Sequence, residues 1–120
     1  MTLEQSPIWD QEALKGRLRG KTDRMVKLVN LFLDDMPPRM DLLKEQVLAA
    51  NHADIGATAH TIKGVSANLG IMRLQFRAGE LEQAAKNLES DKALFLLAAI
   101  SDEYEQSEAA LKAFVLEHSE

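Results

Sequence analysis

The sequence contains no cysteine among its 120 residues, which excludes disulfide bonds and thiolate metal sites and is compatible with a reducing compartment. No segment is rich in Lys and Arg, and the formal net charge is −5, so we expect no nucleic acid among its partners. No apolar run approaches the ~20 residues of a membrane-spanning helix, and the first residues show no signal-peptide pattern. These absences favour a cytoplasmic location without direct membrane contact.

Proline is also scarce, with three residues in the chain, and no segment alternates between apolar and polar residues over the length of a strand. Apolar residues instead recur at steps of three and four, which is the period of a helix packed on one side. Hydrophobic residues make up 46% of the sequence and charged residues 28%, as is typical of a compact domain. We therefore predict a single all-α domain over residues 1–120.

The apolar spacing predicts an antiparallel up-down-up-down four-helix bundle with a short extra N-terminal helix. The short helix is expected at about residues 10–19, as a lid across one end, and the bundle at about 22–118. The predicted core stripes are Met25, Val29, Phe32, Met36, Leu43 and Val47; Ile55, Ala59, Ile62, Ser66 and Leu69; Ile71, Leu74, Ala78, Leu81, Ala85 and Leu88; and Ala93, Leu97, Ile100, Tyr104, Ser107, Leu111 and Phe114. Because one such bundle buries its own stripes, we expect a monomer.

Local signals mark the ends of these helices. The expected N-caps are Asp10, Asn51 and Ser90, whose side-chain oxygens can accept from free backbone N–H groups. Gly70 is expected to end the third helix. Pro37 and Pro38 fall inside the second helix, which is expected from about residue 22 to 50. Since proline removes a backbone donor and clashes with the preceding turn, we expect a kink or a break there, with two separate helices as the alternative.

The third helix carries a histidine on an unusually bare face. His60 lies about 140° around the helix from Ile55, on the side opposite the core stripe, and is expected to face water. Its neighbours at three, four and seven residues are Ala53, Gly56, Ala57, Lys63, Gly64 and Ala67. Two interior glycines cost about 1 kcal/mol each relative to alanine. Such a surface indicates that another protein can approach His60 without striking bulky side chains.

The chemistry of this face favours phosphoryl transfer. A neutral imidazole is a competent nucleophile, and Lys63, one turn on, can offer a cation to phosphoryl oxygens. Phosphoryl transfer needs mainly positioning and charge neutralisation, so these groups suffice if a partner supplies the metal and the second reactive group. His52 and His118 lack such surroundings and are expected to be ordinary solvated side chains. A solvated surface side chain is also the alternative for His60.

The segment from His60 to Gly70, HTIKGVSANLG, resembles the signature of histidine-containing phosphotransfer domains of multistep phosphorelays, with lysine and glycine three and four residues after the histidine. The resemblance covers almost the whole chain. It implies that His60 is the phosphoacceptor, that Lys63 assists the phosphoryl group and that Gly64 leaves room for a receiver domain. In some members a polar residue on the neighbouring helix bonds the histidine; that place falls on Glu82, with Gln83 and Gln75 as other candidates.

The resemblance also implies the partners. Receiver domains of response regulators or of a hybrid sensor histidine kinase are expected to dock on this face and to bring an aspartate and Mg²⁺. We therefore expect a phosphocarrier without autokinase activity, metal site or intrinsic cofactor. The expected docking face comprises Gly56, Ala57, Gly64, Ala67 and Glu82, with Arg73 and Arg77 adding positive potential beside Lys63. Both a free-standing protein and the cytosolic C-terminal domain of a membrane-bound hybrid kinase fit, and we favour the second.

Two other classes of function remain as alternatives. Di-iron bundles use Glu-x-x-His pairs on inward faces, and none of the three histidines has a glutamate three residues before it. The sequence also lacks a Walker-type glycine loop and a cysteine nucleophile, which disfavours an independent enzyme. A structural or adaptor bundle that docks receivers without chemistry is the second alternative. The presence of both His60 and Lys63 speaks against it.

Overall fold

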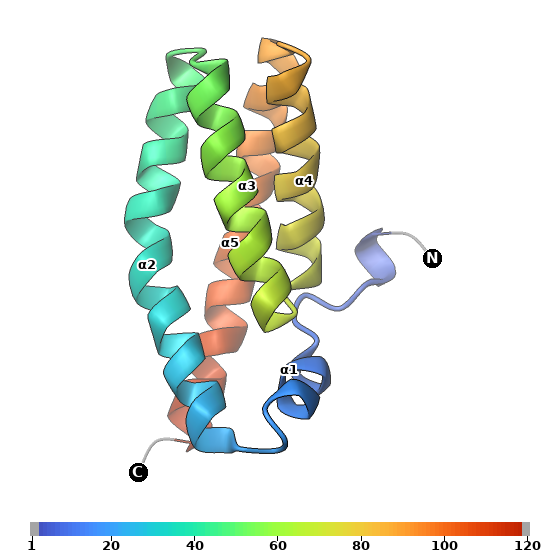
Figure 1. The fold of residues 1–120 in the computed structure, drawn as a ribbon, viewed down its shortest axis with the longest axis vertical. Helices are drawn as coiled ribbons and strands as arrows, with labels where there is room; N and C mark the ends of the chain where they lie inside the picture. Colours follow the sequence, from blue (N-terminus) through green and yellow to red (C-terminus); the bar gives the residue numbers. More distant parts are fainter. Residues whose placement is uncertain (1–2, 119–120) are drawn as a thin grey trace.

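The computed structural model describes residues 3–118 and consists of helices joined by short turns (Figure 1). The elements are η1 (Leu3–Gln5), α1 (Gln11–Arg17), α2 (Thr22–Leu48), α3 (His52–Leu69), α4 (Met72–Lys86) and α5 (Ser90–His118). No strand occurs between residues 3 and 118, so the prediction of an all-α fold is confirmed. The predicted domain extends to residues 1, 2, 119 and 120, which lie outside the described residues.

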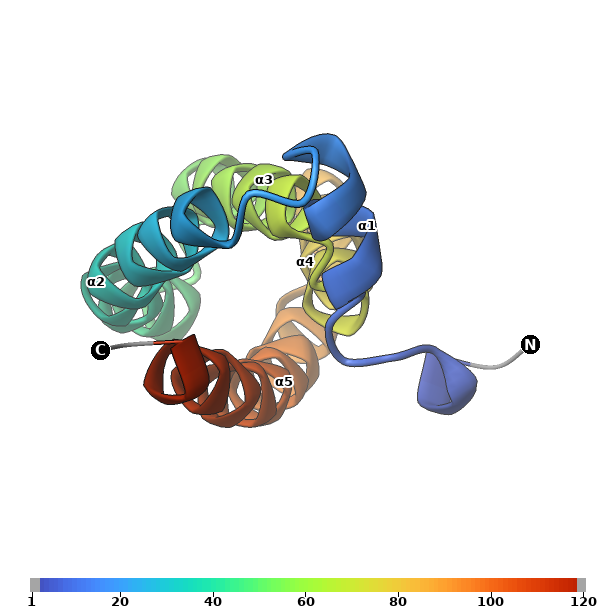
Figure 2. The same cartoon turned by 90° about the horizontal axis from the view of Figure 1, so that it is seen from below.

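Helices α2 to α5 form the predicted up-down-up-down bundle, and their unequal lengths explain the position of α1. Helices α2 and α5 have 27 and 29 residues, whereas α3 and α4 have 18 and 15. At 1.5 Å per residue, the long pair extends roughly 15 Å beyond the short pair. Helix α1 lies below the ends of α3 and α4 at this point, beside the overhanging ends of α2 and α5 (Figures 1 and 2). The short N-terminal helix is therefore present, and it covers the ends of α3 and α4 at one end of the bundle.

The lid is attached to the end of α3 by specific contacts. Gly70 ends α3 with a φ of +81°, which a glycine adopts without the steric cost of a Cβ atom. The Gly70 carbonyl accepts a hydrogen bond of 2.8 Å from the Asp10 N–H, and the Asp10 side chain in turn caps α1 at the Ala13 N–H. The Trp9 Nε1 donates to the Leu69 carbonyl at 2.8 Å, and its ring packs edge-on against Phe114.

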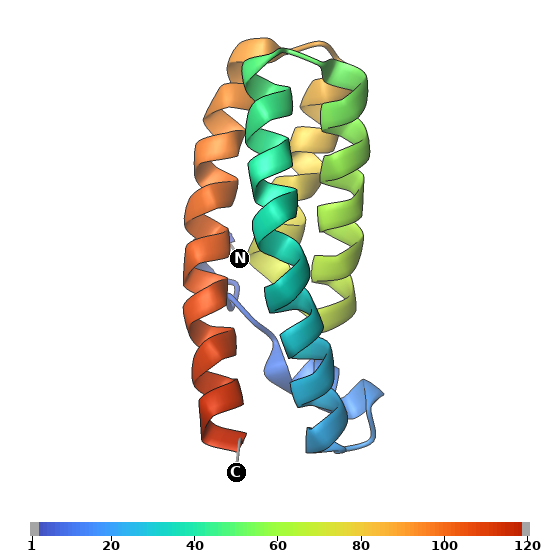
Figure 3. The same ribbon diagram turned by 90° about the vertical axis from the view of Figure 1, so that its left-hand side faces the viewer.

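Helix α2 continues without interruption through Pro37 and Pro38, so the alternative with two separate helices is wrong. Both prolines are exposed, whereas Met36 and Leu43 on the inner face are buried. The two prolines therefore lie on the outer face of the helix, and packing of the inner face keeps the helix continuous. Helix α2 runs alongside α5 over most of its length (Figure 3).

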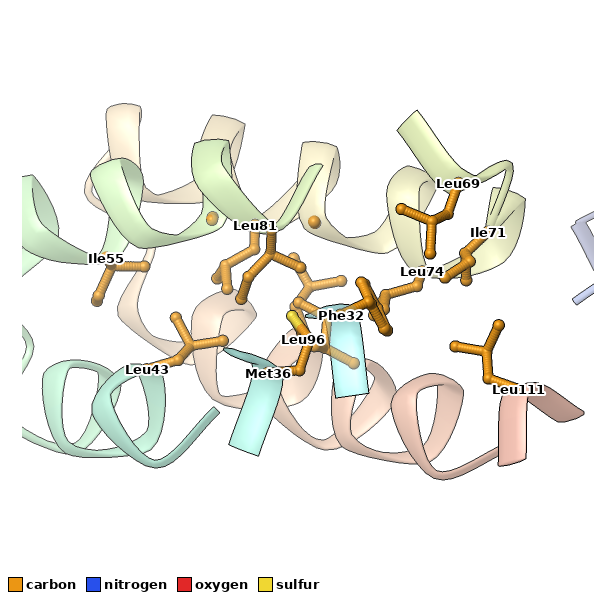
Figure 4. Close-up of a cluster of buried hydrophobic side chains, with 14 of the residues drawn as sticks. Phe32, Met36, Leu43, Ile55, Leu69, Ile71, Leu74, Leu81, Leu96 and Leu111 are labelled. Atoms are coloured by element: carbon orange, nitrogen blue, oxygen red, sulfur yellow. The ribbon is translucent and has the colours of Figure 1, made fainter. Parts of the chain in front are cut away.

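The predicted core stripes are confirmed with three exceptions (Figure 4). Leu88 is 68% exposed, because it lies in the turn after α4 with a φ of +58°. On α5, Leu97 and Tyr104 are half-buried, while the buried positions belong to Leu96 and Glu103.

Ser90 was predicted to be the N-cap of α5, which would make residue 91 the first helical residue. Helix α5 instead begins at Ser90 itself. Within the described residues, no helix combines the length and the apolar character needed to cross a bilayer.

Candidate functional site

Helices α3 and α4 pack closely along their length (Figure 1), and small residues allow this approach. A Cβ atom placed on Gly56 of α3 would lie 3.7 Å from the Ala85 Cβ of α4, an ordinary van der Waals distance. With Ala59 buried between the helices, His60 is left at the outer edge of the α3–α4 contact. Its side chain is 67% exposed, as its helical phase predicts.

Glu82 of α4 bridges His60 and Lys63. One carboxylate oxygen, Oε2, lies 2.8 Å from His60 Nδ1. The other oxygen, Oε1, lies 2.6 Å from Lys63 Nζ. We call these three side chains the His60–Glu82–Lys63 cluster. The structure thus brings together the predicted phosphoacceptor, the predicted cation and the first of the three candidates for the polar neighbour of the histidine.

The ionisation state of Glu82 fixes the tautomer of His60. The hydrogen bond from Lys63 lowers the pKa of Glu82 most, burial opposes it by raising the pKa, and the bond to His60 lowers it further. An ionised carboxylate is an acceptor only, so His60 Nδ1 carries the hydrogen in this contact. In the neutral ring, the lone pair is then on Nε2. Among residues 3–118, Nε2 has no hydrogen-bond partner.

A groove of about 740 Å³ runs from His60 toward the N-terminal end of α3. Its lining is Ala53, Gly56, Ala57, Thr61 and Ala85, together with His52, Glu82, Lys86 and Leu88. Five of the ten lining residues are glycine, alanine or threonine, so small side chains border His60 on this side, which agrees with the predicted bare face. On the other side, a Cβ atom on Gly64 would meet no atom within 4 Å. Ala67 is half-buried one turn further along α3.

Gly79 of α4 is a site residue that the sequence reasoning missed. A Cβ atom built there would lie 3.4 Å from Lys63 Cδ, so the lysine stem crosses α4 directly over this glycine on its way to Glu82. A larger residue at this position would displace the stem. The available signal was a further interior glycine, one turn before Glu82 in a predicted helix, where glycine is otherwise unfavourable.

Arg73 lies on the opposite side of α4 from Glu82, the partner of Lys63, so its predicted place beside Lys63 is wrong, whereas the expectation for Arg77 stays a prediction. Arg73 Nε is 3.2 Å from Glu103 Oε2 on α5, and Arg77 pairs with Glu80 on its own helix at 2.8 Å. Arg73 precedes Glu82 by nine residues, which places the two side chains about 180° apart around α4. The positive potential of Arg73 is therefore directed toward α5, where a buried carboxylate neutralises it.

The two remaining histidines make local hydrogen bonds. His52 Nε2 lies 3.2 Å from the Ser90 hydroxyl at the start of α5, and His118 Nδ1 lies 2.9 Å from the Phe114 carbonyl. Within residues 3–118, neither is paired with a carboxylate. Over the part of the chain that the structure describes, no group of three or more acidic or histidine side chains is arranged to hold a metal ion.

Comparisons with known proteins agree with this geometry. The family model of the Hpt domain matches residues 27–110, which is more than half of the chain and includes all three members of the His60–Glu82–Lys63 cluster. The fold is similar to the crystal structure of histidine-containing phosphotransfer protein B (HptB) from Pseudomonas aeruginosa PAO1, with a TM-score of 0.87 and 24% sequence identity over 95% of this chain and 99% of that one. No match was found among curated proteins. The chain belongs to the Hpt domain family and is a histidine phosphotransfer protein of a phosphorelay.

Proposed function

We propose that His60 Nε2 accepts a phosphoryl group from the phosphoaspartate of one receiver domain and passes it to the aspartate of another. The observation that carries this proposal is the contact of Glu82 Oε2 with His60 Nδ1 at 2.8 Å, on a ring that is 67% exposed. The carboxylate holds the ring by the nitrogen that bears the hydrogen. The nucleophilic nitrogen is therefore left open to a partner.

The transfer needs no proton movement on this chain. The lone pair of Nε2 forms the N–P bond while the bond between phosphorus and the aspartyl oxygen breaks, and the aspartate leaves as a carboxylate. The reverse sequence on the second receiver returns His60 to its neutral form with the hydrogen on Nδ1. Mg²⁺, expected on the receiver, would neutralise charge on the phosphoryl oxygens. Lys63 adds a cation one helical turn from the reacting nitrogen.

Receiver domains are the partners that the surface around His60 fits. Gly56, Ala57, Gly64 and Ala67 give this part of α3 a low profile, so the rigid active site of a receiver can reach Nε2 without displacing side chains. The receiver can belong to a response regulator or to a hybrid sensor kinase. We further propose that the chain has no autokinase activity, because the sequence offers no nucleotide-binding glycine loop. We also propose that it is a cytoplasmic monomer, since one bundle buries its own apolar stripes.

The proposal is tested by label transfer. The full chain is incubated with a receiver carrying labelled phosphoaspartate and Mg²⁺, and the stability of the transferred label is measured. We expect phosphate that is labile in acid and stable in base on the wild-type chain, and none on His60→Gln. His52→Gln is the matched control, since His52 lies on the same helix and lines the same groove; it should accept label normally. Label retained by His60→Gln, or no label from any receiver, would refute the assignment.

A further inference from the structure

The two carboxylate oxygens of Glu82 contact different side chains, His60 and Lys63. Of these two side chains, only His60 becomes phosphorylated during transfer. Oε2 faces His60 Nδ1 and Oε1 faces Lys63 Nζ, at 2.8 and 2.6 Å. Glu82 has 29% of its side chain exposed, so its charge is less screened than that of a fully solvated carboxylate. A phosphoryl group on Nε2 would leave the contact at Nδ1 in place.

The hydrogen on Nδ1 decides how readily a phosphohistidine gives up its phosphoryl group. With this hydrogen present, the ring of the phosphorylated side chain is cationic, and the N–P bond breaks to release a neutral imidazole. Without it, the same bond must release an imidazolate anion, which is a far poorer leaving group. Any group that retains the Nδ1 hydrogen therefore keeps the phosphoryl group ready for transfer.

We propose that Glu82 keeps the Nδ1 hydrogen on phosphorylated His60, so that the phosphohistidine stays in its transfer-ready, ring-protonated form at neutral pH and above. This inference rests on the proposed function and assigns Glu82 as a positioning residue that acts through His60. The step balances, because the N–P bond forms as the P–O bond of the phosphoaspartate breaks and the ring hydrogen remains shared with Glu82. No additional acid or base is required.

A carboxylate is suited to this role and an amide is not. Both can accept a hydrogen bond from Nδ1, but only the carboxylate adds a negative charge that stabilises a cationic ring. The other titratable groups around the ring are Lys63 on α3, Lys86 on α4 and His52 at the far end of the groove. All three are cationic when protonated and oppose a ring charge. Glu82 is thus the group in this set that favours retention of the hydrogen.

Lys63 disfavours retention of the Nδ1 hydrogen, because its ammonium pairs with the same carboxylate and partly neutralises its charge. The Lys63 side chain is 38% exposed, so the ammonium has access to an incoming phosphoryl group. Any movement of Lys63 from Oε1 toward the phosphoryl oxygens would leave the charge of Glu82 more fully available to Nδ1. Removal of Lys63 and removal of the Glu82 charge should therefore shift the titration of the phosphorylated ring in opposite directions.

The test uses the full chain with ¹⁵N-labelled histidine, phosphorylated directly by phosphoramidate, and follows Nδ1 protonation by NMR as the pH is raised. In Glu82→Gln the midpoint should fall by about one pH unit or more relative to wild type, as expected for loss of an opposite charge within contact distance. For each pH unit by which the midpoint falls, the rate of phosphate loss at a fixed pH above it should fall about tenfold. Lys63→Met should move the midpoint upward.

Glu80→Gln is the matched control, because Glu80 is on the same helix with similar exposure and pairs with Arg77 rather than with His60. It should titrate like wild type. Equal midpoints for wild type and Glu82→Gln, or a downward shift in Lys63→Met, would overturn the inference while leaving His60 as phosphoacceptor. Phosphate on another residue, with none on His60, would instead overturn the proposed function. A poorly folded Glu82→Gln chain leaves the Lys63→Met measurement as the deciding result.

Discussion

The ammonium of Lys63 lies 2.6 Å from a carboxylate oxygen of Glu82, so the cation expected to meet the phosphoryl group is already paired before that group arrives. Its charge is not lost, because the lysine stem crosses α4 over Gly79 and the ammonium remains accessible from solvent. The pair holds Lys63 beside His60 while also holding Glu82 against Nδ1. One carboxylate therefore orders both groups that the transfer reaction uses.

Lys63→Met should slow phosphoryl transfer from a receiver by roughly tenfold, because the phosphoryl oxygens lose a nearby cation. The measurement is a single-turnover transfer rate at saturating receiver. Lys112→Met on α5 is the control, since Lys112 is likewise paired with a glutamate, Glu108, but on another helix. A rate for Lys63→Met equal to that of this control would show that the cation is dispensable.

Glu82 should make stability depend on pH in a defined direction. Its pKa is lowered in the folded chain, mainly by the hydrogen bond from Lys63, so the stabilisation is fully present above the pKa of the unfolded chain and is lost as the pH falls through the folded value. Glu82→Gln should therefore be less stable than wild type at pH 7, by about 1 kcal/mol or less for a partly exposed pair.

This difference should disappear in acid. Urea unfolding of both proteins at pH 7 and at successively lower pH gives the free energy of unfolding for each. The two curves should converge as Glu82 of the wild-type chain becomes protonated. A difference that persists unchanged into acid would mean that Glu82 stabilises the fold by packing rather than by charge.

Gly70→Ala should destabilise the chain by about 2 kcal/mol or more. The backbone at Gly70 has a φ of +81°, and an added Cβ atom would lie 2.9 Å from the Asp10 carbonyl oxygen, so the substitution combines a left-handed backbone with a collision in the attachment of the lid. Gly16→Ala is the comparison, because its Cβ would meet nothing within 4 Å. Equal midpoints of unfolding for the two variants would contradict this account of the lid.

The sequence was sufficient for features that depend on one helix at a time. The exposure of His60 follows from its angle to Ile55 on α3, and the caps at Asp10 and Asn51 follow from their local chemistry. The continuity of α2 through Pro37 was not predictable in this way. It depends on packing of the inner face, which a proline signal does not report.

Features that depend on two helices were less accessible. On α5, Leu96 and Leu97 satisfy the steps of three and four equally well, so periodicity alone does not decide which is buried. The structure buries Leu96 and with it Glu103, whose charge is met by Arg73 from α4. Arg73 itself lies on the side of α4 opposite Glu82, away from the face of His60. A charged residue in the core stripe is stabilised only by a partner that single-helix reasoning does not see.

Gly64→Leu should leave the fold nearly intact and block receiver docking. The position is exposed, a Cβ atom there meets nothing within 4 Å, and leucine favours helix over glycine, so stability should be equal or slightly higher. The long side chain would nevertheless project one turn from His60, where a receiver must approach to bring its aspartate to Nε2.

Transfer from a phosphorylated receiver to Gly64→Leu should therefore fall by about a hundredfold or more, as expected when the reacting atoms are held even 1 Å out of position. Phosphorylation of the same variant by phosphoramidate should proceed normally, because a small donor does not need the docking surface. Gly16→Leu, at an equally open position on α1, should show neither effect. Normal receiver transfer by Gly64→Leu would mean that the glycine has another purpose, and an equal loss with both donors would point to damage at His60 itself.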